Sequence, residues 1–214
     1  MKILCVGYRD WALNIYTELK VQIPEHEFII LSSEVEFETY SVENVNPDLI
    51  LFYGWSSIVP QKLINAYRCI MLHPSKLPKY RGGSPIQNQI INGVTSSAVT
   101  LFLMNQDLDA GPILKQYPLS LEGTLDQIFN DISFIGYKLT EQLLNEGLRP
   151  KPQEHSKATY FKRRKPEESE ITLKELSEKP FSYLYNKIRM LDDPYPSPFI
   201  MTSDKKKLYI KLKK

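Results

Sequence analysis

Hydrophobic residues fall in short continuous runs along the chain, and the first run predicts a βα unit. The opening stretch, MKILCVGYRDWALNIYTELK, begins with a buried strand, turns at Gly7 and continues into a helix. The apolar face of that helix contains Trp11, Ile15 and Leu19. Three more apolar runs follow, at residues 27–33, 47–55 and 68–73. Each is continuously apolar, as expected for strands of a parallel sheet that is covered on both faces.

Two further strands are predicted at residues 97–105 and 112–121, on either side of the loop QDLDAGP. From Thr124 the spacing of hydrophobic residues changes to that of a helix, with Thr124 as N-cap and Gln127 completing a capping box. Its apolar stripe consists of Ile128, Ile132, Ile135, Leu139 and Leu143. Because strands alternate with helices, we expect an α/β fold with a mainly parallel, twisted sheet over residues 1–150.

The rest of the chain, residues 151–214, predicts a small extension with no large core. Residues 151–171 are polar and charged, which is typical of a crossing over the surface. A short helix is expected at 180–191, and residues 198–212 alternate as a β-hairpin does. The basic tail DKKKLYIKLKK is either a solvated strand face, whose lysines protect a sheet edge, or a contact for an anion.

Composition and charge exclude several classes of protein. At 214 residues, 42% of them hydrophobic, the chain is long enough for one substantial domain and a small appendage. The apolar runs are shorter than the roughly 20 residues of a membrane span, and Met1 leads directly into a strand. We therefore expect a soluble cytoplasmic protein with no membrane partner. Cys5 and Cys69 lie in apolar runs and are expected to be buried thiols, and the sequence contains no cluster of metal ligands.

Polar chemistry is concentrated in the segment MLHPSKLPKYRGGSPIQNQ, residues 71–89, which we predict to be neither ordinary helix nor ordinary strand. His73 ends the fourth predicted strand, and open α/β sheets bind ligands at the carboxyl ends of their strands. Prolines hold the chain extended and glycines allow close approach of the backbone, so a rigid loop facing a ligand is predicted. The other histidines, His26 and His155, lie in polar stretches and are expected at the surface.

A second candidate segment is NQDLDAGPIL, which contains Asp107 and Asp109. These residues either form an ordinary turn with Gly111 or place a carboxylate beside the imidazole of His73. In the second case the carboxylate would orient the ring and relay a proton. Such a pair needs no metal.

Two further loops follow predicted strands. In GWSSIVP, Trp55 is either packed in the core or part of a slot in which the main chain of residues 56–59 binds a flat heterocycle. The turn from Gly7 to Trp11 leads into a helix N-terminus, where unpaired N–H groups suit a phosphate. A single glycine there does not make a dinucleotide-binding fingerprint.

These segments, in this order, resemble those of the folate-dependent formyltransferases, the family that includes glycinamide ribonucleotide, methionyl-tRNA and nucleotide-sugar formyltransferases. LHPSKLPKYRGGSPIQ and LDAGPI correspond to the family's His-Pro-Ser loop and Asp-x-Gly loop, and the 36 positions from His73 to Asp109 match its spacing. The resemblance is best from about Pro47 to Leu114. It implies a Rossmann-like formyltransferase core, formyltransferase activity, and His73 and Asp109 as catalytic residues.

The same resemblance implies the ligands. The cofactor would be 10-formyltetrahydrofolate, with its pterin against Ser56, Ser57, Ile58 and Val59 and against the backbone of Asn105, Leu108 and Asp109. The candidate contacts for a nucleotide diphosphate are Gly7, Tyr8, Arg9, Lys79, Tyr80 and Arg81. Tyr80 and Arg81 could equally hold the proline loop in shape.

One position departs from the family pattern. The family has an asparagine two residues before the catalytic histidine, and this chain has Met71. An amide that stabilises a developing oxyanion contributes about 3 kcal/mol, and a thioether cannot donate a hydrogen bond. Three interpretations stay open: Asn88 or Gln87 supplies the missing amide, the enzyme is slow, or the chain binds ligand without turnover.

The ending KIRMLDDPYPSPFI, with its hairpin, resembles that of bacterial nucleotide-sugar N-formyltransferases. This resemblance implies formyl transfer to the primary amine of a dTDP- or UDP-linked amino sugar, for surface polysaccharide of the O-antigen type. It also implies a homodimer formed through the C-terminal region. The methionyl-tRNA enzymes of this family carry a further C-terminal domain. A net charge of +2 is also small for a protein that binds RNA through its phosphates. We therefore expect no nucleic-acid partner. The alternatives are an impaired folate- or nucleotide-sugar-binding protein, or another amine-directed formyltransferase.

Overall fold

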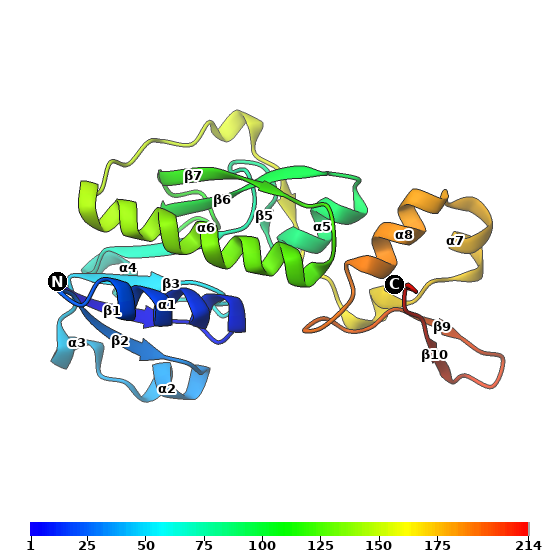
Figure 1. Ribbon diagram of the computed structural model, residues 1–214, viewed down its shortest axis with the longest axis horizontal. Coiled ribbons are helices and arrows are strands. Elements are labelled where there is room, and N and C mark those ends of the chain that lie inside the picture. The colour runs from blue at the N-terminus through cyan, green and yellow to red at the C-terminus, as the bar shows by residue number, and fades with distance from the viewer. Residues whose placement is uncertain (214) are drawn as a thin grey trace.

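A six-stranded sheet forms the centre of the computed structural model, which describes residues 1–213 (Figure 1). The strand order is β2-β1-β3-β4-β6-β7. The bounds are β1 Lys2–Val6, β2 Glu27–Leu31, β3 Leu49–Phe52, β4 Cys69–His73, β6 Ser96–Leu103 and β7 Ile113–Ser120. The first four are parallel, whereas β6 pairs antiparallel with β4 and β7 antiparallel with β6. The prediction of a mainly parallel α/β fold is confirmed.

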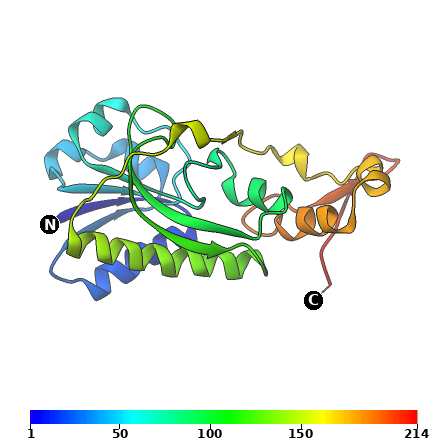
Figure 2. The same cartoon turned by 90° about the horizontal axis from the view of Figure 1, so that it is seen from above.

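Helices cover both faces of this sheet, as Figure 2 shows from above. The long helices α1 (Asp10–Gln22) and α6 (Leu125–Glu146) pack on one face, against alternate β1 side chains that include Ile3 and Cys5. The other face carries α2 (Glu34–Thr39), α3 (Val42–Val45) and α4 (Gln61–Ala66). The fully apolar strands follow from this arrangement, because neither sheet face meets water. The predicted capping box of Thr124 and Gln127 at the start of α6 is present.

The C-terminal extension lies beside one end of this core (Figure 1). It contains α7 (Leu173–Glu178), α8 (Phe181–Arg189) and the antiparallel hairpin of β9 (Phe199–Met201) and β10 (Lys207–Tyr209). The predicted short helix and hairpin are therefore confirmed, and α7 is an additional helix. Both cysteines are free and buried. Within residues 1–213, no helix is both long and apolar enough to cross a membrane.

Two expectations about loops are wrong. Beyond the predicted strand end at His73, the segment of residues 71–89 contains regular structure: the short strand β5 (Arg81–Gly82) and most of helix α5 (Pro85–Ile91). Proline is tolerated at the first position of a helix because its missing N–H has no partner there anyway. The polar stretch 151–171 does more than cross the surface, since its strand β8 (Tyr160–Phe161) pairs in parallel with β5.

Candidate active site

A cavity of about 1140 Å³ opens at the carboxyl ends of β3 and β4. One wall is formed by the loop after β3, a second by the loop between β6 and β7, and a third by the start of α5. The fourth wall comes from the C-terminal extension, through residues 160–166 and 194–196. The cavity is thus enclosed by segments that are more than a hundred residues apart in the sequence.

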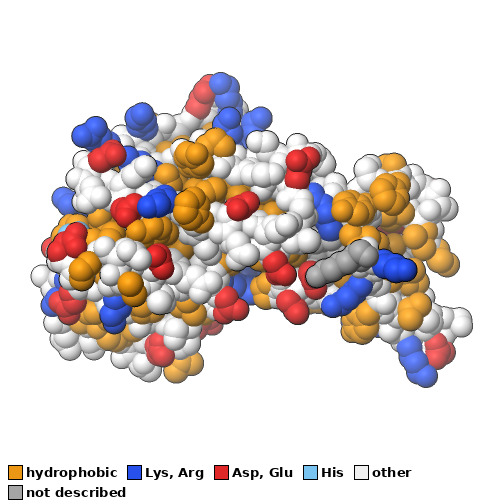
Figure 3. All heavy atoms as spheres, viewed as in Figure 1, with side chains coloured by type: hydrophobic (Ala, Val, Ile, Leu, Met, Phe, Trp, Pro, Cys, Tyr) orange, Lys and Arg blue, Asp and Glu red, His pale blue; other side chains and the backbone are white. Residues whose placement is uncertain are grey.

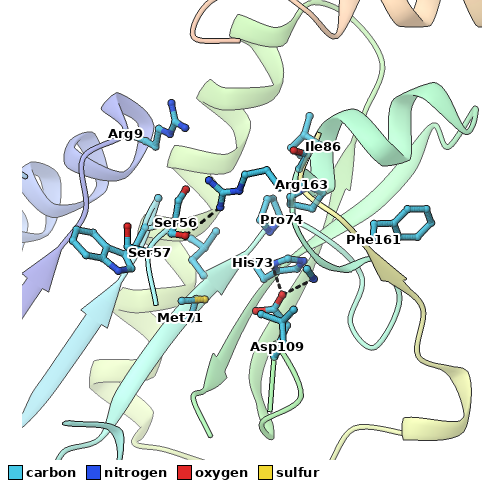
Figure 4. A pocket seen from close by; sticks show the side chains of 18 of the residues that line it. Arg9, Ser56, Ser57, Met71, His73, Pro74, Ile86, Asp109, Phe161 and Arg163 are labelled. Carbon is cyan, nitrogen blue, oxygen red and sulfur yellow. Dashed lines mark hydrogen bonds and ion pairs between the residues drawn. The ribbon is translucent and has the colours of Figure 1, made fainter. Parts of the chain in front are cut away.

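His73 and Asp109 meet on this cavity, as Figure 4 shows. His73 is 5% exposed and Asp109 is 7% exposed. The imidazole Nδ1 lies 3.5 Å from Asp109 Oδ2. The same carboxylate oxygen accepts a hydrogen bond of 2.7 Å from the backbone N–H of Gly82. The structure therefore brings together the two residues that the sequence suggested as a pair.

The tautomer of His73 follows from its second contact. Nε2 lies 2.8 Å from the backbone carbonyl oxygen of Tyr80. Because a carbonyl can only accept, Nε2 carries a hydrogen, an assignment made from the hydrogen-bond network. Nδ1 is then the ring atom that can exchange a proton, and Asp109 is placed to stabilise the ring when it holds one.

The Asp109 loop is held by Gln153, a residue that sequence reasoning missed. The Gln153 amide Nε2 donates to the carbonyl oxygens of Asp109 (2.9 Å) and Gly111 (2.6 Å). Its Oε1 accepts from two nitrogens of Arg81, at 3.2 and 2.6 Å. Asp109 itself has a left-handed backbone with φ 50°, which these bonds help to maintain. No local pattern in the polar stretch around Gln153 marks this role.

Arg81 is fully buried, and its remaining contacts are with Tyr160 and His155. Nη1 donates to the Tyr160 hydroxyl at 2.6 Å, and Nη2 lies 3.3 Å from His155 Nδ1. His155 is exposed, as expected. Since the guanidinium is committed inside the protein, the structure supports the interpretation in which Arg81 shapes the loop.

Gly82 and Gly83 allow the backbone to approach closely, but what approaches is the protein's own strand. A Cβ at Gly82 would lie 2.3 Å from the Phe161 carbonyl oxygen, and one at Gly83 would lie 2.4 Å from the backbone of Arg163. Both glycines also line the cavity, so the prediction of a loop that faces a ligand stays a prediction. They bring the C-terminal segment against the active site.

The expected cofactor loop lines the cavity over residues 54–60. The Ser57 hydroxyl of this loop donates a hydrogen bond to Glu34 Oε1. The Ser56 carbonyl accepts a hydrogen bond of 3.2 Å from Arg163 Nη2. Ile58 is 96% exposed, whereas Val59 is buried. Asn105 and Leu108 line the opposite side of the cavity.

Two buried polar atoms that line the cavity have no hydrogen-bond partner. They are Nε1 of Trp55, a donor, and Oε1 of Gln87, an acceptor. In residues 1–213 the remaining buried side-chain atom of this kind is His26 Nδ1. Buried polar groups are normally satisfied, so this concentration around one cavity indicates places for ligand groups. Trp55 also packs against Tyr8, with ring centroids 5.4 Å apart.

Met71 and Asn88 do not supply an amide donor to the site. Met71 lines the cavity two residues before His73, so both side chains lie on the same face of β4. Asn88 is buried, and its Nδ2 donates to the carbonyls of Gly83 (2.9 Å) and Lys162 (3.3 Å). Because both amide hydrogens are used, the prediction of a catalytic role for Asn88 is not supported. Of the two amides considered, Gln87 is the one that lines the cavity.

Of the residues expected to bind a nucleotide, Arg9 lines the cavity. The backbone of Gly7 is packed against Tyr53, and the Tyr8 ring packs at a tilt against Trp55. The other three, Lys79, Tyr80 and Arg81, do not line the cavity. Tyr80 instead packs its ring on Phe161, with centroids 4.6 Å apart.

Comparison with known proteins supports the interpretation of these loops. The family model described as formyl transferase matches residues 31–140. Methionyl-tRNA formyltransferase of Campylobacter lari is 39% identical over 140 residues, which are 64% of this chain and 46% of that protein. The chain spans about half the length of the curated relatives it matches.

Solved structures show the same fold. A methionyl-tRNA formyltransferase from Clostridium thermocellum superposes with a TM-score of 0.86 at 33% identity, covering 95% of this chain and 88% of that one. A sugar N-formyltransferase from Shewanella sp. gives 0.80 at 19% identity, covering 99% and 97%. The His73 and Asp109 loops lie inside the matched region and the match extends over half of the chain, so this protein belongs to the formyl transferase family.

Proposed function

We propose that this protein transfers a formyl group from 10-formyltetrahydrofolate to the primary amine of a dTDP- or UDP-linked amino sugar. The observation that carries the proposal is the His73–Asp109 pair, buried together on a large cavity at the carboxyl ends of parallel strands. The folate fits the residues present, because Trp55 Nε1 is an unpaired buried donor beside the loop of residues 56–59. Bound there, 10-formyltetrahydrofolate supplies the formyl group.

The chain's own contribution is positioning and proton transfer. An amine attacks only as the neutral base and must lose a proton as the new amide bond forms. Nε2 of His73 is fixed on the Tyr80 carbonyl, so Nδ1 is the atom that receives this proton. Asp109, held by Gly82 and by the Gln153 support of its loop, stabilises the protonated ring.

A second candidate for the formyl acceptor is methionyl-tRNA, because the relatives at 33% and 39% identity are methionyl-tRNA formyltransferases. We favour the sugar because the ending KIRMLDDPYPSPFI and its hairpin resemble the ending of the nucleotide-sugar enzymes. A sugar N-formyltransferase also aligns with 99% of this chain over 97% of its own, whereas the methionyl-tRNA formyltransferase of Clostridium thermocellum aligns with 95% and 88%. A third candidate, a folate- or nucleotide-sugar-binding protein without turnover, is kept because Met71 stands where the family has asparagine.

One assay separates these functions. The purified protein is incubated with 10-formyltetrahydrofolate and, separately, with dTDP-amino sugars, UDP-amino sugars or methionyl-tRNA, and tetrahydrofolate release is followed. We expect release with one sugar and a loss of about 10²- to 10⁴-fold in kcat for His73→Ala and Asp109→Asn. His26→Ala, a histidine outside the cavity, is the control. Tetrahydrofolate release with methionyl-tRNA alone would overturn the proposal that the acceptor is an amino sugar. Folate binding without release from any acceptor would establish that the protein binds its ligand without turnover.

We also propose that the chain forms a homodimer through the C-terminal extension. Large apolar side chains are exposed on α7 and α8, including Leu173 (77%) and Phe181 (80%). Figure 3 shows hydrophobic side chains at the surface of this part of the molecule. Such a patch on a small element marks an interaction surface. We expect a dimer in sedimentation velocity that Phe181→Asp converts to monomer. Val21→Asp, at a 65% exposed valine on α1, is the control and should stay dimeric.

A further inference from the structure

Cationic side chains line the side of the cavity that the C-terminal extension forms. Lys162, Arg163, Arg164 and Lys165 lie along that wall, and Arg9 lies at the start of α1. The acidic residues that line the cavity are Asp107 and Asp109, and Asp109 is occupied by His73. This imbalance contrasts with a net charge of +2 for the whole chain. The positive charge is therefore local to the cavity.

Four of these five cations form no ion pair among residues 1–213, and two of the four, Arg9 and Arg163, are arginines. Arg164 pairs with Glu168, with Nη1 3.7 Å from Oε1. By contrast, Arg9 and Arg163 form no ion pair with any described carboxylate in residues 1–213. Arg163 donates only to the Ser56 carbonyl, and Arg9 lies over the Tyr8 ring at 5.5 Å. Each guanidinium keeps donors that a ligand can use, because arginine has five N–H groups.

Tyr195 and Gln87 join these two arginines. Burial raises the pKa of the Tyr195 hydroxyl, while Arg9, the Gln87 side chain and Arg163 each act to lower that pKa. All four side chains line the same cavity, which is the geometric basis for grouping them. Gln87 is 3% exposed, and its Oε1 is the buried acceptor without a partner.

The cluster is assembled from four separate segments. Arg9 precedes α1, Gln87 lies in the first turn of α5, Arg163 follows β8, and Tyr195 lies between α8 and β9. In Figure 4 the side chains of Arg9 and Arg163 lie on the Ser56 side of the cavity, away from Asp109. These two arginines therefore lie apart from the pair that handles the proton.

We propose that Arg9, Arg163 and Tyr195 form a phosphate-binding subsite for the diphosphate of the acceptor substrate, with Gln87 Oε1 accepting from a hydroxyl of the attached sugar. This inference rests on the proposed function, since it names where the acceptor of that reaction is held. Guanidinium groups bind phosphate oxygens through paired, charge-assisted hydrogen bonds. The unpaired acceptor on Gln87 cannot bind a phosphate oxygen, so it selects a ligand that also carries a donor.

The test measures binding without chemistry. Titration calorimetry of the full chain with UDP, dTDP and inorganic pyrophosphate, in the absence of folate, should show binding of both nucleotides. Arg9→Ala and Arg163→Ala should each weaken it about 10- to 100-fold, with partial recovery in the lysine variants. Arg149→Ala, which removes an exposed arginine outside the cavity, should leave it unchanged. Circular dichroism and folate affinity of Arg9→Ala check that the variants fold.

Each outcome separates this subsite from the proposed function. Formyl transfer to an amino sugar with undiminished activity in both alanine variants overturns the subsite and leaves the function. Nucleotide binding that depends on both arginines, without formyl transfer, supports the subsite and overturns the function. A third experiment measures the binding of methionyl-tRNA. Binding that depends steeply on salt and is lost in the same variants, together with no binding of UDP or dTDP, would assign the cluster to RNA phosphates. It would overturn the proposal that the cluster binds a diphosphate.

Discussion

At the scale of single residues, Met71 is the position where this chain departs most clearly from its family. It lines the cavity beside His73, and Asn88 is committed elsewhere. A thioether cannot donate to a developing oxyanion, whereas an amide there contributes on the order of 3 kcal/mol.

We therefore expect Met71→Asn to raise kcat about 10- to 100-fold, with a smaller change in KM, because the new amide acts mainly in the transition state. Steady-state kinetics of formyl transfer measure this effect. The control is Met71→Leu, which keeps the apolar shape and should stay near the parent rate. An unchanged kcat in Met71→Asn would show that another group already serves the oxyanion, with Gln87 the first to examine.

Gln153 is a positioning residue whose single amide connects the Asp109 loop to Arg81. Gln153→Leu leaves the carbonyls of Asp109 and Gly111 and part of the Arg81 guanidinium without partners. We expect a loss of about 3 kcal/mol in unfolding free energy, measured by urea denaturation, because a buried charge loses a partner. At a temperature where the variant is folded, kcat should fall about tenfold or more while folate affinity is retained. Equal kcat in the two proteins would restrict Gln153 to a structural role.

At the scale of elements, α7 and α8 are joined by an ion pair that makes the extension sensitive to acid. Lys187 Nζ lies 2.7 Å from Glu175 Oε1, and the lysine side chain is 5% exposed. Burial acts to raise the pKa of Glu175, but the hydrogen bonds from Lys187, Thr172 and Tyr183 outweigh it and leave the pKa below 4.5.

Because the folded state lowers this pKa, the pair stabilises the protein above about pH 4.5 and is lost as the pH falls through the folded value. We expect the stability difference between the parent and Glu175→Gln to shrink steadily below pH 4.5. Urea denaturation from pH 7 to pH 3 measures it. Glu178→Gln, at an exposed glutamate on the same helix, is the control. A difference that does not change with pH would contradict this assignment.

At the scale of the whole molecule, the cavity walls come from both the sheet core and the C-terminal extension. A ligand that fills the cavity therefore contacts both parts and stabilises them together. Binding of ligand at about 100 times its Kd adds roughly 2.7 kcal/mol to the unfolding free energy.

With a folate such as 5-formyltetrahydrofolate at that concentration, we expect Tm to rise by about 5 to 10 °C. With UDP also present, trypsin cleavage after Lys162, Arg163 and Arg164 should slow, because these residues line the filled cavity. Cleavage at the exposed lysines 205–207 serves as the internal control. A thermal shift without protection of residues 162–165 would show that ligand contacts the core alone.

The sequence by itself determined the elements of the core and the identity of the candidate catalytic pair. Strand runs, the capping box at Thr124 and the loops at His73 and Asp109 are local patterns, set by side-chain period and turn chemistry. The tertiary structure decided which polar groups meet. Arg81 and Gln153 are 72 residues apart in the sequence, so no local pattern could predict that they satisfy each other.

The same reason explains the remaining corrections. From the sequence, both Asn88 and Gln87 could supply an amide to the site. In the structure the Asn88 amide donates to two backbone carbonyls, whereas Gln87 lines the cavity. The two differ because adjacent positions on a helix point in different directions. Arg163 reaches the cavity where Gly82 and Gly83 allow the backbone of residues 161–163 to approach closely. Local chemistry is encoded by neighbours along the chain, whereas the hydrogen-bond partners of buried polar groups come from distant segments and exist only once the chain has folded.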